Sequence, residues 1–228
     1  MRILAFALPL LFLGLAGCTE ADDDGSGGGS DLAAGRTSCD GVTKAGLTLT
    51  DANNPVVALA TSKGCIVAEL REDKAPITVS NFLNYTDEGF YSDLLFHRII
   101  EGFMVQTGGM TKEGQFKTAT HPMIKNEARS SGLKNEAYTL SMARTTPPDS
   151  ATNQFFINHE ANTNLDPAGN SAGYAVFGMV VQGRDVVDAM AGVPVEPYRA
   201  GLKCQAEGEG SASCPVTDVD LFSVKRVV

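Results

Sequence analysis

The residues with the clearest potential for chemistry lie in the stretch 96–106, which reads FHRIIEGFMVQ. It places Arg98, a permanently charged and donor-rich side chain, beside the apolar residues Phe103 and Met104 and a single amide, Gln106. An apolar surface with one strong hydrogen-bond donor suits an uncharged substrate that has a carbonyl group to hold. A proline residue within a peptide has this character. Taken alone, however, an arginine in such a setting is more often a surface residue with its aliphatic stem packed down.

A second cluster of small and aromatic residues follows at 141–144 and 153–158, which read SMAR and NQFFIN. Successive side chains of an extended segment point to opposite faces, so one of Phe155 and Phe156 should face the core. We therefore expect this cluster to give one aromatic side chain to a binding surface. Met142 is expected in the core.

The elements that position these clusters are mainly short β-strands. Residues 56–60 and 65–70 are β-rich runs on either side of a turn, which indicates a hairpin. Pro76 suits a first helical turn, and apolar residues spaced by three and four predict a helix over about 76–87, ending near Gly89. A second helix is predicted over 184–190. Further strands are predicted over 95–100, 104–107, 138–142, 154–158, 175–180 and 216–227.

This order of elements favours a single mainly β domain. Seven or eight short strands with two helices favour a closed antiparallel barrel with helical caps, because closure removes exposed sheet edges. Residues 54–228 are enough for one domain with one core. No internal repeat is apparent.

The first residues have the form of an export signal. A charged start precedes an apolar run over residues 3–16, which is shorter than the about 20 residues that a membrane span needs. The junction at 15–18, LAGC, resembles the bacterial lipoprotein signal, and this resemblance implies removal of residues 1–17 and lipid on Cys18. Because Thr19 is not the aspartate of an inner-membrane retention signal, we expect an anchor in the outer membrane that faces the periplasm. The alternative is a plain secretory signal.

An N-terminal extension over residues 18–53 follows the predicted cleavage point. Its first part, residues 20–30, reads EADDDGSGGGS. Such acidic, glycine- and serine-rich sequence cannot bury enough apolar surface to offset the entropy of ordering it, so we expect a flexible tether. Residues 31–54 have no clear pattern.

The remaining four cysteines fit an exported chain. An even number of cysteines outside the cytosol permits two disulfides, with three possible connectivities. Cys204 and Cys214 flank a Gly-, Ser- and Glu-rich segment that reads as a loop, so we favour a Cys204–Cys214 bridge and, by elimination, a Cys39–Cys65 bridge. A four-cysteine zinc site is disfavoured because the chain has no Cys-x-x-Cys pair.

Composition and motifs argue against several function classes. The formal net charge is −9, and no block of Lys or Arg exists to form the basic face that nucleic-acid binding needs. His97, His121 and His159 lie far apart on different segments, so no metal site and no cofactor is expected. Ser141 and Ser150 lack the Gly-x-Ser-x-Gly signature of a serine hydrolase.

From about Pro55 to Val228 the chain resembles the cyclophilins, which are peptidyl-prolyl cis-trans isomerases. The resemblance rests on ordered blocks at family-like spacing, and the short loop over 143–153 is similar to the bacterial branch. It implies a closed eight-stranded antiparallel barrel capped by two helices. The blocks are residues 96–106, 124–127 (IKNE), 132–135 (GLKN), 141–144, 153–158 and 174–178 (YAVFG).

The resemblance also implies roles for individual residues. Arg98 is the expected catalytic residue, and Phe155 is the expected core member of its aromatic pair. The expected substrate-binding residues are those of the proline pocket, Phe103, Met104, Phe156 and Leu165, and those that line the peptide groove, Gln106, Ala143 and Gln154, with Tyr174 beside them.

Two positions depart from the eukaryotic pattern. Asn164 stands where a tryptophan is common, and the chain contains no tryptophan. Tyr174 stands where a histidine is common. We therefore expect cyclosporin to bind weakly, while catalysis is affected less.

The chemistry that this resemblance implies needs no nucleophile. An X–Pro bond rotates slowly because amide resonance gives the C–N bond double-bond character, with a barrier of about 18–20 kcal/mol. In the twisted transition state the proline nitrogen regains a lone pair that can accept a hydrogen bond. Arg98 can supply that bond, and a contact made only in the transition state lowers the barrier.

The sequence therefore predicts an enzyme, which the retained Arg98 favours over the alternatives: a monomeric, lipid-anchored isomerase that acts on proline-containing exported proteins in the bacterial cell envelope. One alternative is a binding module that holds proline-containing segments, for which an apolar surface without Arg98 would suffice. The other is an envelope lipoprotein with little isomerase activity.

Overall fold

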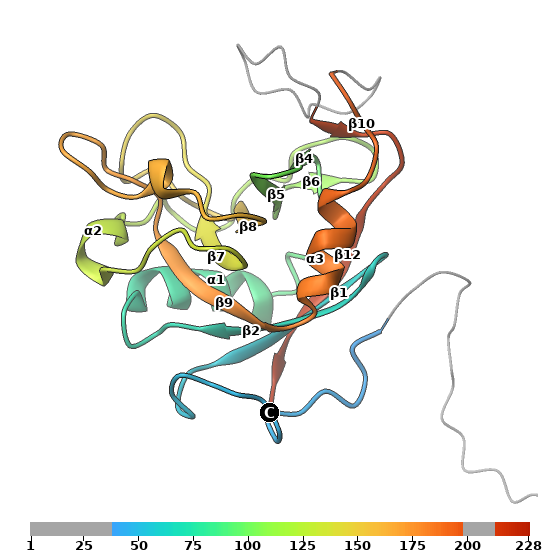
Figure 1. The fold of residues 1–228 in the computed structure, drawn as a ribbon, viewed down its shortest axis with the longest axis horizontal. Coiled ribbons are helices and arrows are strands. Elements are labelled where there is room, and N and C mark those ends of the chain that lie inside the picture. Colours follow the sequence, from blue (N-terminus) through green and yellow to red (C-terminus); the bar gives the residue numbers. More distant parts are fainter. Residues whose placement is uncertain (1–37, 198–212) are drawn as a thin grey trace, which may run out of the picture. The chain divides into compact units, whose positions relative to one another are not determined.

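The computed structural model describes residues 38–197 and 213–228, which belong to one compact unit, Ala33–Val228. Within these residues, ten strands form one antiparallel sheet, in the order β4-β5-β8-β7-β9-β2-β1-β12-β3-β6 (Figure 1). A small second sheet pairs β10 with β11. The strands of the large sheet are β1 (Val56–Thr61), β2 (Gly64–Leu70), β3 (Leu94–Leu95), β4 (Arg98–Ile100), β5 (Met104–Thr107), β6 (Met110–Thr111), β7 (Thr139–Met142), β8 (Phe155–Asn158), β9 (Val176–Gln182) and β12 (Asp220–Val227). The small sheet contains β10 (Val195–Glu196) and β11 (Cys214–Pro215).

In the described part of the chain, three α-helices and one short 3-10 helix accompany the sheets. They are α1 (Pro76–Asp87), α2 (Ala128–Ser131), α3 (Arg184–Ala191) and the 3-10 turn Thr163–Leu165. Helix α1 lies against β12, and α3 lies against β2, β4 and β5. None of the helices in the described part of the chain has the length and apolar character needed to cross a membrane.

The core is built around packed aromatic rings. Phe82 of α1 contacts Tyr91, Phe155 and Phe177, with ring centroids 5.1 Å apart in each case. All four side chains are fully buried. Burying such large apolar surfaces is the main favourable contribution to folding, so these contacts hold α1 against the sheet that carries the site residues.

The predicted fold class is confirmed, and three of its details are wrong. The sheet has ten strands rather than eight, and within the described ranges no pairing joins its end strands β4 and β6 into a closed barrel. The predicted strand over 95–100 is two strands, because β3 pairs with β12 and β6 whereas β4 pairs with β5. The apolar residues over 95–100 did not indicate that the two ends of this segment pair with different strands.

Helix α2 is the helix that the sequence analysis missed. It has four residues, which is too short for helical periodicity to be visible. Its ends are set locally: Ala128 N–H donates to the Asn126 side chain at 2.9 Å, and Gly132 follows in the left-handed conformation, φ 69°. The predicted helices over 76–87 and 184–190 and the hairpin are confirmed.

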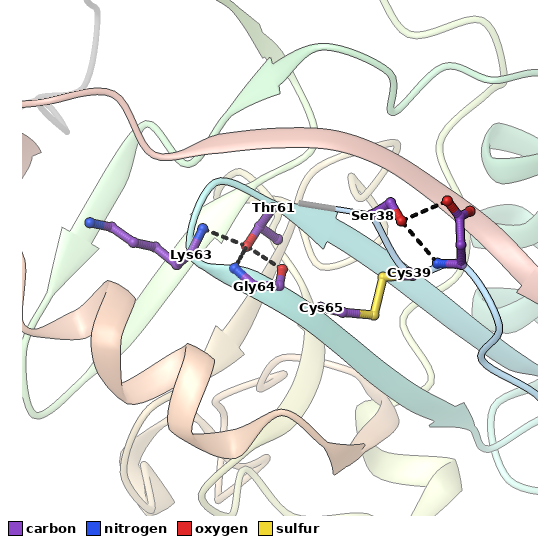
Figure 2. The surroundings of a disulfide bond; sticks show 7 residues. Ser38, Cys39, Thr61, Lys63, Gly64 and Cys65 are labelled. Atoms are coloured by element: carbon purple, nitrogen blue, oxygen red, sulfur yellow. Dashed lines mark hydrogen bonds between the residues drawn. A yellow bond between two sulfur atoms is a disulfide. The ribbon is translucent and has the colours of Figure 1, made fainter. Parts of the chain in front are cut away.

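Residues 38–54 pack against the outer face of β1, β2 and β12. A disulfide joins Cys39 to Cys65 of β2. It lies beside the hairpin turn, in which the N–H groups of Lys63 and Gly64 donate hydrogen bonds to Oγ1 of Thr61 (Figure 2). The predicted Cys39–Cys65 bridge is thus confirmed. Apolar side chains of the segment, Val42, Leu47 and Leu49, contact the outward-facing apolar residues of the sheet.

A buried carboxylate holds the same segment at its other end. Glu69 of β2 is fully buried and accepts hydrogen bonds from Thr50 N–H at 2.8 Å, Asp51 N–H at 3.1 Å and Asn54 Nδ2 at 2.8 Å. Burial alone raises the pKa of Glu69, but these hydrogen bonds outweigh burial and lower it. The segment is therefore tied to β2 by one covalent bond and one polar cluster.

Some of the predicted features lie outside the described residues. These are the signal peptide over 1–17, the lipidation site Cys18, residues 18–37 of the tether and N-terminal extension predicted over 18–53, and Cys204. Cys214 is buried in β11, and the Cys204–Cys214 pairing stays a prediction.

Candidate active site

Three of the predicted site residues form a row across neighbouring strands. Arg98 of β4 is the register partner of Gln106 in β5, and Gln106 is the register partner of Phe156 in β8. Directly opposed residues in an antiparallel sheet point to the same face. The pairing therefore places the guanidinium, the amide and the aromatic ring side by side on one face.

Met104 lies beside the arginine on the same face. It is two residues from Gln106 in β5, and its sulfur lies 3.9 Å from Nη1 of Arg98. Met104 is 1 % exposed, whereas Arg98 is half-buried. The guanidinium is thus held against a soft, apolar side chain, as the apolar surroundings of Arg98 in the sequence led us to expect.

A line of hydrogen bonds connects this row to Ala143. Gln106 Nε2 donates to Gln154 Oε1 at 3.0 Å, and Ala143 N–H donates to the Gln154 carbonyl at 3.0 Å. The Gln154 side chain needs the glycine beside it, because a Cβ at Gly109 would lie 2.9 Å from Gln154 Cγ. Gly109 therefore has a steric role that the sequence analysis did not assign.

Phe156 connects the row to the last two predicted residues. Its ring meets that of Tyr174 edge-on, with centroids 5.8 Å apart, and Tyr174 N–H donates to the Leu165 carbonyl at 2.9 Å. The neighbouring residue Phe155 points to the other face and is fully buried in the core, as is Met142. The predicted core positions of Phe155 and Met142 are confirmed, whereas the substrate-binding role of Phe156 stays a prediction.

Arg144 is a neighbour of the site that the sequence analysis left without a role. Its guanidinium lies over the Tyr174 ring, 4.5 Å from the centroid, and donates to the carbonyls of Gly173 and Thr145 at 3.0 and 2.9 Å. These contacts fix the position of the Tyr174 ring. Arg144 belongs to the block SMAR, and nothing near it in the sequence pairs it with Tyr174.

Phe103 lies in the turn between β4 and β5 and is held through its backbone. Its carbonyl accepts hydrogen bonds from His159 N–H at 2.9 Å and from Asn162 Nδ2 at 2.8 Å. Asn162 is the second residue that the sequence analysis missed, since no motif separates it from other loop asparagines.

His97, next to Arg98 in the chain, is buried and contacts the Phe116 ring at a centroid distance of 5.5 Å. Burial lowers the pKa of His97 to about 4, and the charge of Arg98 acts in the same direction. The imidazole is therefore neutral at physiological pH. It adds no second positive charge beside Arg98.

The three histidines lie in separate places, with His121 bound to Glu88 and His159 to Gly102. Across residues 38–197 and 213–228, no group of three or more His, Cys, Asp or Glu side chains is arranged to hold a metal ion.

The structure thus links the nine residues predicted for catalysis and substrate binding, most of them through side-chain contacts or strand register, and Phe103, Ala143 and Leu165 through backbone hydrogen bonds; we call them the substrate-site cluster. Its donor-rich cation among apolar side chains can donate a hydrogen bond to a lone pair on an apolar, uncharged ligand. The particular roles predicted for its members stay predictions. The members are Arg98, Phe103, Met104, Gln106, Ala143, Gln154, Phe156, Leu165 and Tyr174.

The fold and the cluster define a class of protein: a mainly β domain whose antiparallel sheet presents one arginine among apolar residues. The sequence profile described as "Cyclophilin type peptidyl-prolyl cis-trans isomerase/CLD" matches residues 56–204. This is more than half of the chain, and the chain belongs to the cyclophilin-type family.

Curated bacterial relatives agree with this assignment. The chain is 49% identical over 145 residues to a peptidyl-prolyl cis-trans isomerase of Acinetobacter baylyi, covering 64% of this chain and 76% of the relative. It is 52% identical over 141 residues to peptidyl-prolyl cis-trans isomerase B of Escherichia coli, covering 60% and 85%. It is 51% identical over 172 residues to isomerase cyp18 of Streptomyces antibioticus, covering 74% and 96%.

Solved structures show the same fold. A cyclophilin-type isomerase of Cryptosporidium parvum superposes with a TM-score of 0.63 at 22% identity, covering 77% of this chain and 98% of that one. A second structure of that protein, determined in the presence of the dipeptide Ala-Pro, gives a TM-score of 0.59 at 22% identity, covering 75% and 97%.

Proposed function

We propose that this protein is a peptidyl-prolyl cis-trans isomerase that acts on X–Pro bonds of exported proteins and assists their folding in the bacterial cell envelope. The observation that carries the proposal is the position of Arg98, in register with Gln106 and Phe156 and against Met104. Membership of a family whose relatives are named as isomerases supports it.

The proposed mechanism is selective stabilisation of the twisted amide. The apolar side chains of Met104, Phe156 and Leu165 hold the proline ring while the carbonyl before it rotates. Arg98 donates a hydrogen bond to the proline nitrogen, whose lone pair is available as an acceptor only when resonance is lost. A contact of this kind acts on the barrier rather than on substrate binding, and each ~1.4 kcal/mol gained is tenfold in rate.

We further propose that lipid on Cys18 anchors the protein to the outer membrane, with the domain in the periplasm. The disulfide between Cys39 and Cys65 supports an oxidising compartment. The apolar run and LAGC junction before Cys18, followed by an acidic, glycine-rich segment, support an anchor with a tether. One acyl chain binds a membrane only marginally, so stable anchoring needs the multiply acylated terminus of a lipoprotein.

Two experiments test these proposals separately. The purified chain should accelerate cis-trans exchange of an X–Pro peptide in an NMR exchange assay, and an absence of acceleration would refute the isomerase assignment. The location is tested by fatty-acid labelling and fractionation of cells that express the wild type or Cys18→Ser. Labelled, outer-membrane wild type and unlabelled variant are expected, whereas soluble, unlabelled wild type would refute the anchor.

A further inference from the structure

Asn162 lies between two residues of the substrate-site cluster and bonds to both. Its side-chain Nδ2 donates to the carbonyl of Phe103 at 2.8 Å. Its own backbone carbonyl accepts from Leu165 N–H at 2.9 Å. Phe103 belongs to the β4–β5 turn and Leu165 to the 3-10 turn. Asn162 therefore joins two segments of the site, and the residues of its contact with Phe103 are 59 positions apart in the sequence.

The asparagine is held from behind by a buried polar network. Nδ2 of Asn162 also donates to Asn158 Oδ1 at 2.7 Å, and the Asn158 amide donates to Thr139 Oγ1 at 2.9 Å and to Asn135 Oδ1 at 3.2 Å. The Asn162 N–H donates to the Asn135 carbonyl at 2.7 Å.

The network is closed by Asp166, whose Oδ1 accepts from both the N–H and the side-chain amide of Asn135, at 2.9 and 3.0 Å. The residues of this network are almost completely buried; Asn162 itself is 6 % exposed. A buried network in which each amide has a partner holds one arrangement, because any displaced group loses a partner without gaining water. Asn162 therefore has little freedom to move.

We propose that Asn162 is a positioning residue that sets the spacing between Phe103 and Leu165 and thereby the affinity of the site for a proline ring. This inference rests on the proposed function. Asn162 does not touch substrate; it acts through the Phe103 carbonyl on one side and the Leu165 N–H on the other. If either turn shifts, the apolar contacts to the ring are lost in the ground state and in the transition state alike.

This mode of action makes a specific kinetic prediction. Loss of contacts that are equal in the ground and transition states raises KM and leaves kcat unchanged. Loss of the proposed Arg98 contact, which forms only in the transition state, lowers kcat instead. A merely structural role for Asn162 would lower the stability of the fold and leave both constants of the folded protein unchanged.

The experiment compares the full chain with Asn162→Ala and the near-isosteric Asn162→Leu, which approximates the side-chain shape, introduces no charge and removes both N–H donors. Asn54→Ala is the matched control, because Asn54 is equally buried and donates to Glu69 on the outer face of β2, away from the cluster. The amide NMR spectrum of each protein is recorded first, to show that the protein is folded. NMR titration and exchange with one X–Pro peptide then give Kd, KM and kcat.

We expect both Asn162 variants to raise KM and Kd by about twofold to tenfold, the range for loss of the one hydrogen bond that reaches the site, from Nδ2 to the Phe103 carbonyl, with kcat within twofold of wild type. Asn54→Ala should lower the melting temperature and leave all three constants unchanged. Wild-type Kd and KM in a folded Asn162 variant, or a fall in kcat alone, would overturn the inference. If the wild type binds peptide without isomerising it, the proposed function fails, and the Kd comparison still tests Asn162.

Discussion

The carboxylate of Glu127 caps helix α1 through Thr78, from which it accepts a backbone N–H at 2.8 Å and the hydroxyl at 2.7 Å. The residue before the helix, Ala75, provides no side-chain cap, so a residue 49 positions away supplies the acceptor that the first turn needs. An anionic acceptor at this end also complements the helix dipole. The contact links the IKNE segment to the helix that carries the core ring Phe82.

Glu127→Ala should therefore destabilise the fold by about 1–3 kcal/mol, because buried N–H groups lose their acceptor. Glu127→Gln keeps one acceptor oxygen and should lose less. Urea unfolding of both variants measures the difference. Equal stability of Glu127→Ala and wild type would show that the cap is dispensable.

Arg98→Ala should lower kcat/KM by about 100-fold or more, the scale seen when a transition-state hydrogen-bond donor is removed. Arg98→Lys is the matched variant, because it keeps the charge but not the planar fork of donors, and it should recover only part of the activity. The exchange assay on one X–Pro peptide measures all three proteins. A wild-type rate for Arg98→Ala would remove Arg98 from the mechanism.

Asn164→Trp should tighten cyclosporin inhibition while changing peptide turnover much less. Asn164 is exposed in the 3-10 turn next to Leu165, where an indole could pack on the drug and donate a hydrogen bond. Inhibition curves for the two proteins provide the measurement. The expectation is contradicted if the unmodified chain is already inhibited at low nanomolar concentration.

The Cys39–Cys65 bridge should stabilise the domain without affecting the site. The bridge spans 26 positions, for which the chain-entropy model gives about 3–4 kcal/mol. The double variant Cys39→Ala/Cys65→Ala should lose stability of this order and become cleavable by protease between residues 38 and 54. Its kcat/KM should match wild type, because the segment packs on β1, β2 and β12, whereas Arg98 and its register partners lie on β4, β5 and β8. A large loss of activity in folded protein would contradict this separation.

Acid should weaken the fold through His97. Its folded pKa of about 4 lies below the ordinary value of 6.5, so the unfolded chain binds the proton first as pH falls. The contribution of neutral His97 is complete above pH 6.5 and is lost between about pH 6.5 and 4, by about 3 kcal/mol in total. His97→Gln should flatten the dependence of the unfolding free energy on pH between 5 and 6.5, as measured by urea unfolding at several pH values. An unchanged slope would mean that another group dominates this window.

Several elements of the fold could be predicted from the sequence because their signals are local. Pro76 with the spacing of Val79, Phe82 and Leu83 indicates α1, and alternating β-rich runs indicate the hairpin of β1 and β2. The residue types of the 96–106 block placed Arg98 beside Met104 and Gln106, because short strands joined by a tight turn must pair with one another. These inferences depend on neighbours within a few residues.

The tertiary structure alone decided the rest, because it depends on which distant segments meet. Residues 94–100 divide between two strand partners, and the backbone pattern of either part is equally extended. Glu127 and Asn162 are ordinary polar loop residues in the sequence, and each acquires its role from a partner about 50 or more positions away. Burial is what makes these hydrogen bonds matter, because a buried polar group without a partner destabilises the fold. Whether these residues are buried depends on how the whole chain packs, and no local sequence pattern predicts it.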